Sequence, residues 1–204
     1  MFVLDSSGSI GTTNFQKIRN FVNMVISDLD IAPRRTQVGV IVFSTDVSVS
    51  FNLNSYSNRQ ALISAVNRIP YLGHGTNTAD ALYTLINQGF VGARPVDQGV
   101  PRVAMVVTDG MSNKPILTKT AAEALRRMPS ITTYAIGIGS ANVTELRTIA
   151  STRNGQKLVR YISSFDLTEL ERLQEDLREQ ACTGMYACMH SIVIKSYLQF
   201  YYHL

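Results

Sequence analysis

Carboxylate and hydroxyl side chains gather close to the start of the chain. Residues 2–4 are apolar and resemble a buried strand, and the sequence DSSGS of residues 5–9 follows them directly. A second apolar run ends at Asp109, in the sequence TDG. Hard divalent cations take oxygen ligands, so these residue types at two strand ends predict a cation site.

The elements that must position these residues alternate along the chain. Apolar runs predict strands at 1–4, 37–44, 47–53, 102–110, 131–139 and 157–162, and helical periodicity predicts helices at 14–29, 58–69, 77–88, 117–128, 142–150 and 166–180. Such alternation is typical of an α/β fold with a doubly wound, mostly parallel central sheet and helices on both faces. The run from Val47 alternates with period two after a short turn, so we expect one antiparallel edge strand there.

In a doubly wound sheet, ligands bind beyond the carboxyl ends of the strands where the strand order reverses. A 3-2-1-4-5-6 order places Asp5 and Asp109 side by side at that crevice. Two such carboxylates repel each other and are costly to bury, and a divalent cation relieves both effects. Ser7 and Ser9 add neutral oxygens, and no His or Cys is near in sequence, so Mg²⁺, Mn²⁺ or Ca²⁺ is expected.

The sequence LGHGTNTADAL contains a further oxygen donor. Thr76 follows two glycines that permit an unusual backbone, and we expect its hydroxyl to be the fifth ligand. His74 lies between those glycines, where a surface role is the simpler interpretation.

At this point the sequence resembles the von Willebrand factor type A domain family, which includes the integrin inserted domains. Asp5, Ser7, Ser9, Thr76 and Asp109 match the family's metal-ion-dependent adhesion site, a DxSxS run followed by a Thr and an Asp. The resemblance implies a Rossmann-like fold and a divalent ion that bridges to an acidic residue of a protein partner. It also implies a secreted matrix or cell-surface protein, with a collagen among the candidate partners, and no enzyme activity.

The resemblance covers residues 1–181 and leaves residues 182–204 as a tail of unknown role. Four residues are few for a central strand, so we expect the chain to begin inside a longer parent. In many secreted relatives a Cys after the last helix pairs with one before the first strand, which implies that Cys182 has lost its partner. Pairing with Cys188, or two free thiols, are the alternatives.

Two residues near the site have two interpretations each. Ser112 either supports the water shell of the ion or forms a turn. Asn142 begins a glycosylation sequon, NVT, and with Glu145 it also resembles a helix cap with a reciprocal acid.

Other functions fit the same residues less well. The net charge is +4, yet no run of basic residues is longer than a pair, so no nucleic-acid partner is expected. No apolar run reaches the roughly 18 residues of a membrane span. An EF-hand starting at Asp5 requires Gly and Glu where Ile10 and Gln16 stand. An intracellular module of a chelatase or ATPase complex, a structural module with an unused metal site, and a metal-assisted phosphohydrolase using Asp5 remain as alternatives.

Overall fold

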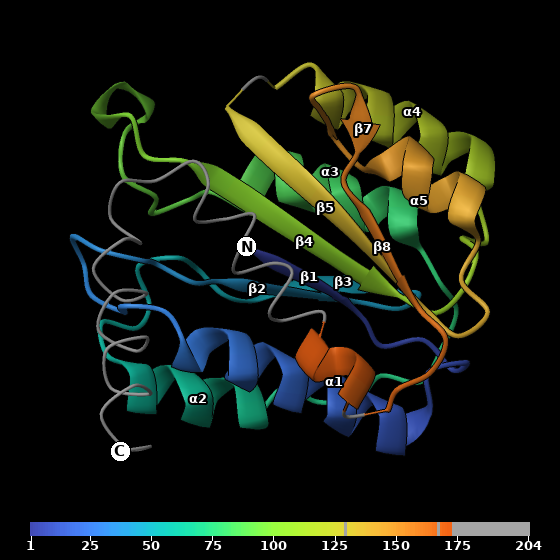
Figure 1. Cartoon of the computed structure of the whole chain (residues 1–204), viewed down its shortest axis with the longest axis horizontal. Helices are drawn as coiled ribbons and strands as arrows, with labels where there is room; N and C mark the ends of the chain where they lie inside the picture. Colours follow the sequence, from blue (N-terminus) through green and yellow to red (C-terminus); the bar gives the residue numbers. More distant parts are fainter. Residues whose placement is uncertain (129, 167, 173–204) are drawn as a thin grey trace, which may run out of the picture.

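The computed structural model describes residues 1–128, 130–166 and 168–172. Six strands form one sheet in the order β3-β2-β1-β4-β5-β8, in which only the β2–β3 pair is antiparallel. This arrangement (Figure 1) confirms the predicted doubly wound, mostly parallel fold and its antiparallel edge strand. The strands are β1 (Phe2–Asp5), β2 (Val40–Phe43), β3 (Val47–Phe51), β4 (Arg102–Thr108), β5 (Ile131–Ile138) and β8 (Val159–Ile162).

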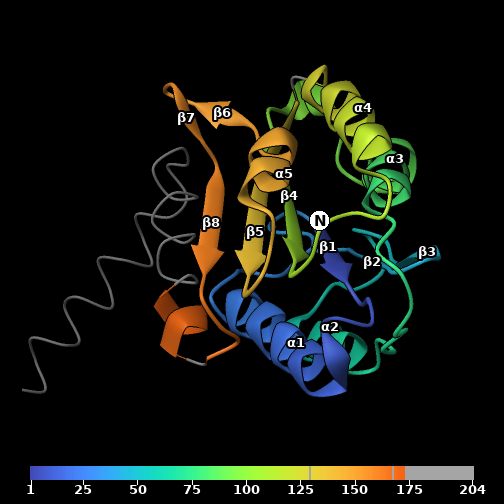
Figure 2. The ribbon, with the colours of Figure 1, turned by 90° about the vertical axis from the view of Figure 1, so that its right-hand side faces the viewer.

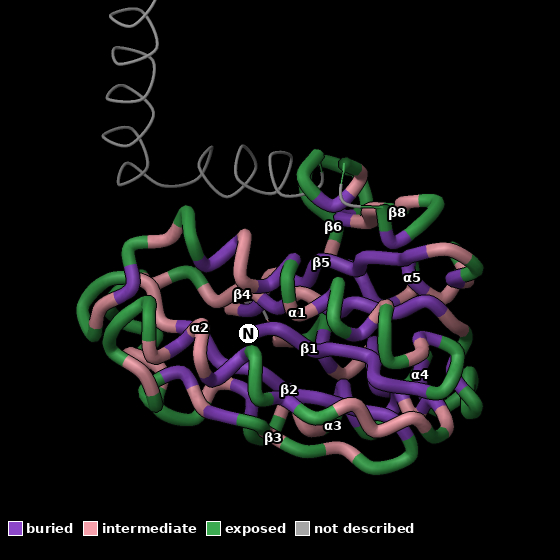
Figure 3. The backbone as a smooth tube through the Cα atoms, turned by 90° about the horizontal axis from the view of Figure 1, so that it is seen from below, coloured by how far each residue is buried: buried purple, intermediate pink, exposed green. Residues whose placement is uncertain are grey.

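Helices cover both faces of the sheet, as predicted. On one face lie α1 (Gly11–Ser27) and α2 (Arg59–Asn67); on the other lie α3 (Thr78–Gln88), α4 (Pro115–Arg126) and α5 (Val143–Ile149), as Figure 2 shows. A short 3-10 helix, η1 (Val96–Gln98), precedes β4. Side chains of β1 alternate between two apolar cores, with Phe2 and Leu4 on the α1 side and Val3 on the other. Strands β1 and β2 are therefore buried on both faces of the sheet (Figure 3).

The register of the two central strands places the predicted ligands together. Leu4 of β1 is level with Val107 of β4, so the residues that follow them leave the same edge of the sheet. Asp5 and Asp109 therefore lie at the carboxyl ends of neighbouring parallel strands, as the strand order predicts.

Helix α1 and strand β2 each begin three residues from the predicted position. Helix α1 starts at Gly11, three residues early, and its N-cap residue is Ile10, which makes no side-chain cap bond. Strand β2 starts at Val40 rather than Gln37, because its partner β1 begins at Phe2, opposite Val40.

A small hairpin was not predicted. Strands β6 (Thr152–Arg153) and β7 (Gln156–Lys157) flank Asn154 and Gly155, whose φ angles are 51° and 76°. Asn-Gly favours positive φ at both central residues of a tight turn, so this hairpin was readable from the sequence.

The C-terminal predictions fall mostly outside the described residues. Residues 168–172 are helical, in agreement with the predicted helix 166–180. The rest of that helix, both cysteines and the tail 182–204 lie outside the described part of the chain. Within that part, no helix is long and apolar enough to cross a membrane.

Candidate metal centre

Asp5 is fully buried at the end of β1, and the chain holds both of its carboxylate oxygens. The Ser7 amide donates to Oδ1 at 2.8 Å, and the Thr108 hydroxyl donates to Oδ2 at 2.6 Å. The pKa of Asp5 is raised to about 6, chiefly by burial and to a smaller extent by the charge of Asp109, while the hydrogen bonds from Ser7 and Thr108 oppose the shift. The carboxylate is thus fixed in direction and costly to ionise without a cation.

Hydroxyls connect Asp5's loop to Asp109. Ser9 Oγ donates to Asp109 Oδ1 at 2.8 Å, and Ser7 Oγ lies 3.2 Å from Ser9 Oγ. Burial also raises the pKa of Asp109. In the described part of the chain no lysine or arginine forms an ion pair with either aspartate. The structure therefore brings together four of the five predicted ligands as an oxygen-only set without a positive side chain.

The loop that carries Thr76 is joined to the DSSGS loop by backbone hydrogen bonds. The Gly8 amide donates to His74 O at 2.7 Å, and Ser7 pairs with His74 as an isolated bridge. Thr76 is buried two residues further along this loop. His74 itself is exposed and contributes its main chain to this contact, in keeping with the surface role expected for its side chain.

Asn113, in the β4–α4 loop, fixes the position of the Thr76 loop, and no local sequence pattern indicates this role. Its amide donates to Thr76 O at 2.9 Å, and its Oδ1 accepts from the Thr76 amide at 2.5 Å. A Cβ on Gly75 would lie 2.8 Å from Asn113 Oδ1, so this close approach requires glycine. Asn113 thereby sets the position of Thr76 without being a candidate ligand.

Replacing Asn113 with alanine leaves the buried Thr76 amide without its acceptor. We expect a loss of about 1 kcal/mol in the free energy of unfolding and weaker binding of any ion that uses Thr76. Urea unfolding in EDTA measures the first effect. Asn20→Ala is the matched control, because Asn20 accepts a side-chain hydrogen bond on the exposed face of α1. Equal effects of the two substitutions would contradict the role given to Asn113.

Two further residues support the backbone of the DSSGS loop. Ser6 is buried and its hydroxyl accepts from the Leu72 amide at 2.8 Å, so it ties two loops rather than offering an oxygen to the site. The Tyr71 hydroxyl donates to Ser7 O at 3.2 Å, and its ring lies 5.8 Å from the ring of Phe15. The loop is thus anchored to the apolar core beneath it.

Ser112 takes the turn role and also connects loops. Its hydroxyl accepts from the Lys114 amide at 3.1 Å and lies 3.4 Å from Thr76 O. Its backbone amide donates to both carboxylate oxygens of Glu145, at 3.1 and 3.3 Å. A role toward the water shell of an ion stays a prediction.

Asn142 caps α5, because its Oδ1 accepts from the Glu145 amide at 3.0 Å. The expected reciprocal bond from Glu145 is replaced by the contact with Ser112. The Asn142 Nδ2, the atom that a glycan would modify, lies 3.5 Å from Met111 Sδ. The cap interpretation is therefore confirmed, while glycosylation stays a prediction.

The donor set fits a divalent cation by its chemistry. Asp5 and Asp109 offer carboxylate oxygens, and Ser7, Ser9 and Thr76 offer neutral hydroxyls. The described residues contain no cluster of three or more His, Cys, Asp or Glu side chains, so any ion held here depends on the hydroxyls.

Comparison with known proteins identifies relatives over most of the chain. Mouse matrilin-2 is 34% identical over 188 residues, which is 91% of this chain and 19% of matrilin-2. The mouse collagen alpha-6(VI) chain is 32% identical over 191 residues, covering 92% of this chain and 8% of the collagen chain. This chain thus spans well under half the length of these relatives.

A solved structure agrees with these sequence comparisons. Proximal thread matrix protein 1 from the mussel byssus was solved with zinc in its metal-ion-dependent adhesion site, the MIDAS motif. It superposes on this chain with a TM-score of 0.76 at 28% identity, over 89% of this chain and 44% of the mussel chain. The relatives are matrix proteins, which confirms the predicted extracellular location. The von Willebrand factor type A domain model matches residues 1–176, and the chain belongs to that family.

Proposed function

We propose that this chain is a divalent-metal-dependent protein-binding domain of an extracellular matrix protein. One observation carries the proposal: the hydroxyl of Ser9 joins the DSSGS loop to Asp109, at a point where two buried carboxylates lack a positive partner in the described residues. A divalent cation is the counterion that such a group of oxygens favours.

Each candidate ligand has a separate task in the proposed site. Asp5 and Asp109 supply negative charge, and Ser7, Ser9 and Thr76 supply neutral oxygens. When bound, the ion offers a Lewis-acidic position that an acidic side chain of a partner can occupy. Asn113 and Tyr71 hold the loops in place. Mg²⁺, Mn²⁺ and Ca²⁺ suit this set, and Zn²⁺ also accepts carboxylate oxygens.

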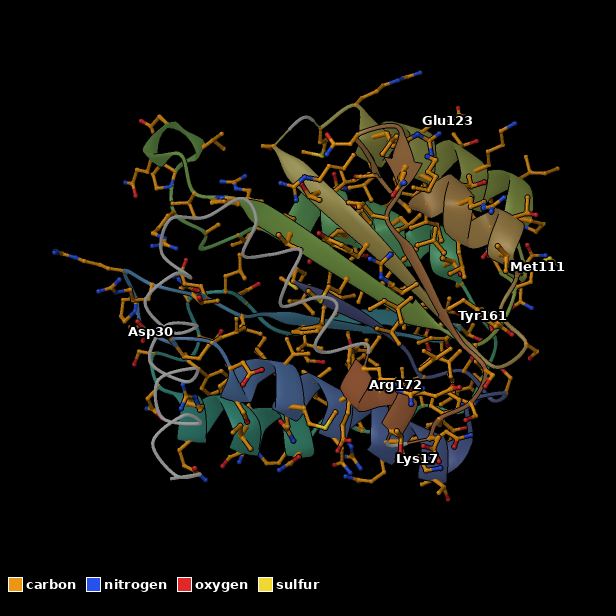
Figure 4. The ribbon with its side chains drawn as sticks, in the orientation of Figure 1. Lys17, Asp30, Met111, Glu123, Tyr161 and Arg172 are labelled. Carbon is orange, nitrogen blue, oxygen red and sulfur yellow. The ribbon has the colours of Figure 1, made fainter. Side chains whose placement is uncertain are left out.

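Exposed apolar side chains at the same edge support a protein partner. Met111 and Ile116 are 55% and 80% exposed in the segment that follows Asp109, and Val143 is 41% exposed at the start of α5. Figure 4 shows Met111 at the end of the molecule toward which β4 and β5 point. Apolar side chains beside a polar centre are typical of protein contact sites, and a collagen is a candidate partner.

The test is calorimetric titration of the purified chain with MgCl₂, MnCl₂, CaCl₂ and ZnCl₂. Asp109→Ala is expected to weaken binding at least about 100-fold, because even groups outside the direct ligands cost about 10–100-fold. Asp97→Asn, an exposed carboxylate in η1 at the opposite edge of the sheet, is the control and is expected to bind normally.

The same variants test the binding of a protein partner. Immobilised collagen is expected to retain the native chain in MgCl₂ and to release it in EDTA, and not to retain Asp109→Ala. Ion binding that survives in Asp109→Ala would refute the site, and retention on collagen in EDTA would refute the metal dependence.

A further inference from the structure

Glu145 is an acidic side chain that reaches the proposed site from a different element. It lies in the first turn of α5, after the cap residue Asn142, and both of its carboxylate oxygens accept from the Ser112 amide at 3.1 and 3.3 Å. Ser112 lies three residues after Asp109, in the loop that also contains Asn113. The carboxylate of Glu145 thus holds the middle of the loop that carries Asp109.

The electrostatic surroundings of Glu145 lack a positive partner. It forms no ion pair with any described lysine or arginine, and burial raises its pKa. The charge of Asp5 acts on that pKa in the same direction. Glu145 thus brings a third, half-buried carboxylate to the loop that follows Asp109, without a positive partner among the described residues.

Local helix capping does not require this placement. In a capping box the acid three residues after the cap residue bonds back to the amide of the cap residue. Here the cap is made by Asn142 alone, and Glu145 turns to Ser112. The described residues hold no cluster of three metal-binding side chains, so Glu145 stands outside the direct ligands.

We propose that Glu145 is a positioning residue of the divalent-ion site, which holds the Asp109 loop through the Ser112 amide and brings a third carboxylate to that loop. This inference rests on the proposed function, because it assigns a residue to the same ion. Groups outside the direct ligands orient the ligands and tune the affinity of the site.

Glu145→Gln tests the charge while keeping an acceptor for Ser112. Calorimetric titration with MnCl₂ is expected to show affinity about tenfold below that of the native chain, the lower end of effects seen for groups behind metal ligands. Asp97→Asn makes the same change of charge at the opposite edge of the sheet and is expected to leave the affinity unchanged.

Thermal unfolding separates this role from simple structural support. In EDTA, Glu145→Gln is expected to unfold at the melting temperature of the native chain or above, because glutamine keeps an acceptor for the Ser112 amide and removes a half-buried, unpaired charge. The stabilisation by added MnCl₂ is expected to shrink. Equal losses of melting temperature in EDTA and in MnCl₂ would overturn the inference, as would Mn²⁺ affinity within twofold of the native chain. A native chain that binds no ion would overturn the proposed function as well, so the two failures are distinguishable.

Discussion

Asp5→Asn is expected to stabilise the ion-free protein at pH 7.5 while abolishing ion binding. The native pKa of about 6, against an ordinary value of 3.8, corresponds to about 3 kcal/mol for keeping Asp5 ionised in its buried position. Asparagine keeps the shape, can accept from the Ser7 amide and can donate to the Thr108 hydroxyl. We expect the variant to gain about 2 kcal/mol in urea unfolding in EDTA.

The raised pKa of Asp5 also sets the sign with which the free energy of unfolding depends on pH. The folded state binds the Asp5 proton more tightly than the unfolded state, so this contribution to stability is complete below about pH 4 and is lost as pH rises through about 6. Asp5→Asn removes that loss. The difference in unfolding free energy between native and variant chains in EDTA is therefore expected to grow from pH 4 to pH 7.

An added cation is expected to reverse the order of stability of the native chain and the Asp5→Asn variant. An ion that binds only the folded, ionised native chain stabilises it by an amount that grows with concentration above the dissociation constant. In saturating MgCl₂ at pH 7.5 we expect the native chain to gain and the variant not to change. A variant less stable than the native chain in EDTA at pH 7.5 would show that the buried charge of Asp5 is offset by the protein itself.

Phe15→Ala is expected to cause the largest loss of stability, about 3–5 kcal/mol in urea unfolding. The side chain of Phe15 is fully buried in α1, its ring lies 5.8 Å from the ring of Tyr71, and the Arg19 guanidinium lies 5.6 Å from its centroid. Removing the ring leaves a cavity under Tyr71, whose hydroxyl holds the backbone of Ser7. Weaker ion binding should accompany the loss.

Phe15→Leu separates packing from the aromatic contact. It keeps most of the buried volume, so its cost is expected to stay below about 1.5 kcal/mol. Ion affinity measured in the two variants below their unfolding transitions tests the link to the site. If Phe15→Ala costs less than about 1 kcal/mol, α1 does not depend on this contact.

Sequence patterns captured the framework because they report on the backbone. The alternation of period-two strands with periodic helices limits the possible strand orders to a few. In each of them the parallel strands end at one edge of the sheet, where the polar residues after each apolar run then lie. Asp5, Ser7, Ser9 and Asp109 were found in this way. The Asn154-Gly155 turn carries an equally local signal in its two residue types.

Tertiary structure decided how the loops beyond those strands use their side chains. Serine is also a common helix cap, yet the Ser9 hydroxyl donates to Asp109, 100 residues away. Asn113 and Glu145 contact loops 37 and 33 residues away, so no local pattern indicates them. The sequence by itself determined which oxygens gather at the sheet edge, because strand order and register place them. Only the folded loops decided which side chains hold those oxygens, because such hydrogen bonds join segments that meet only in the folded state.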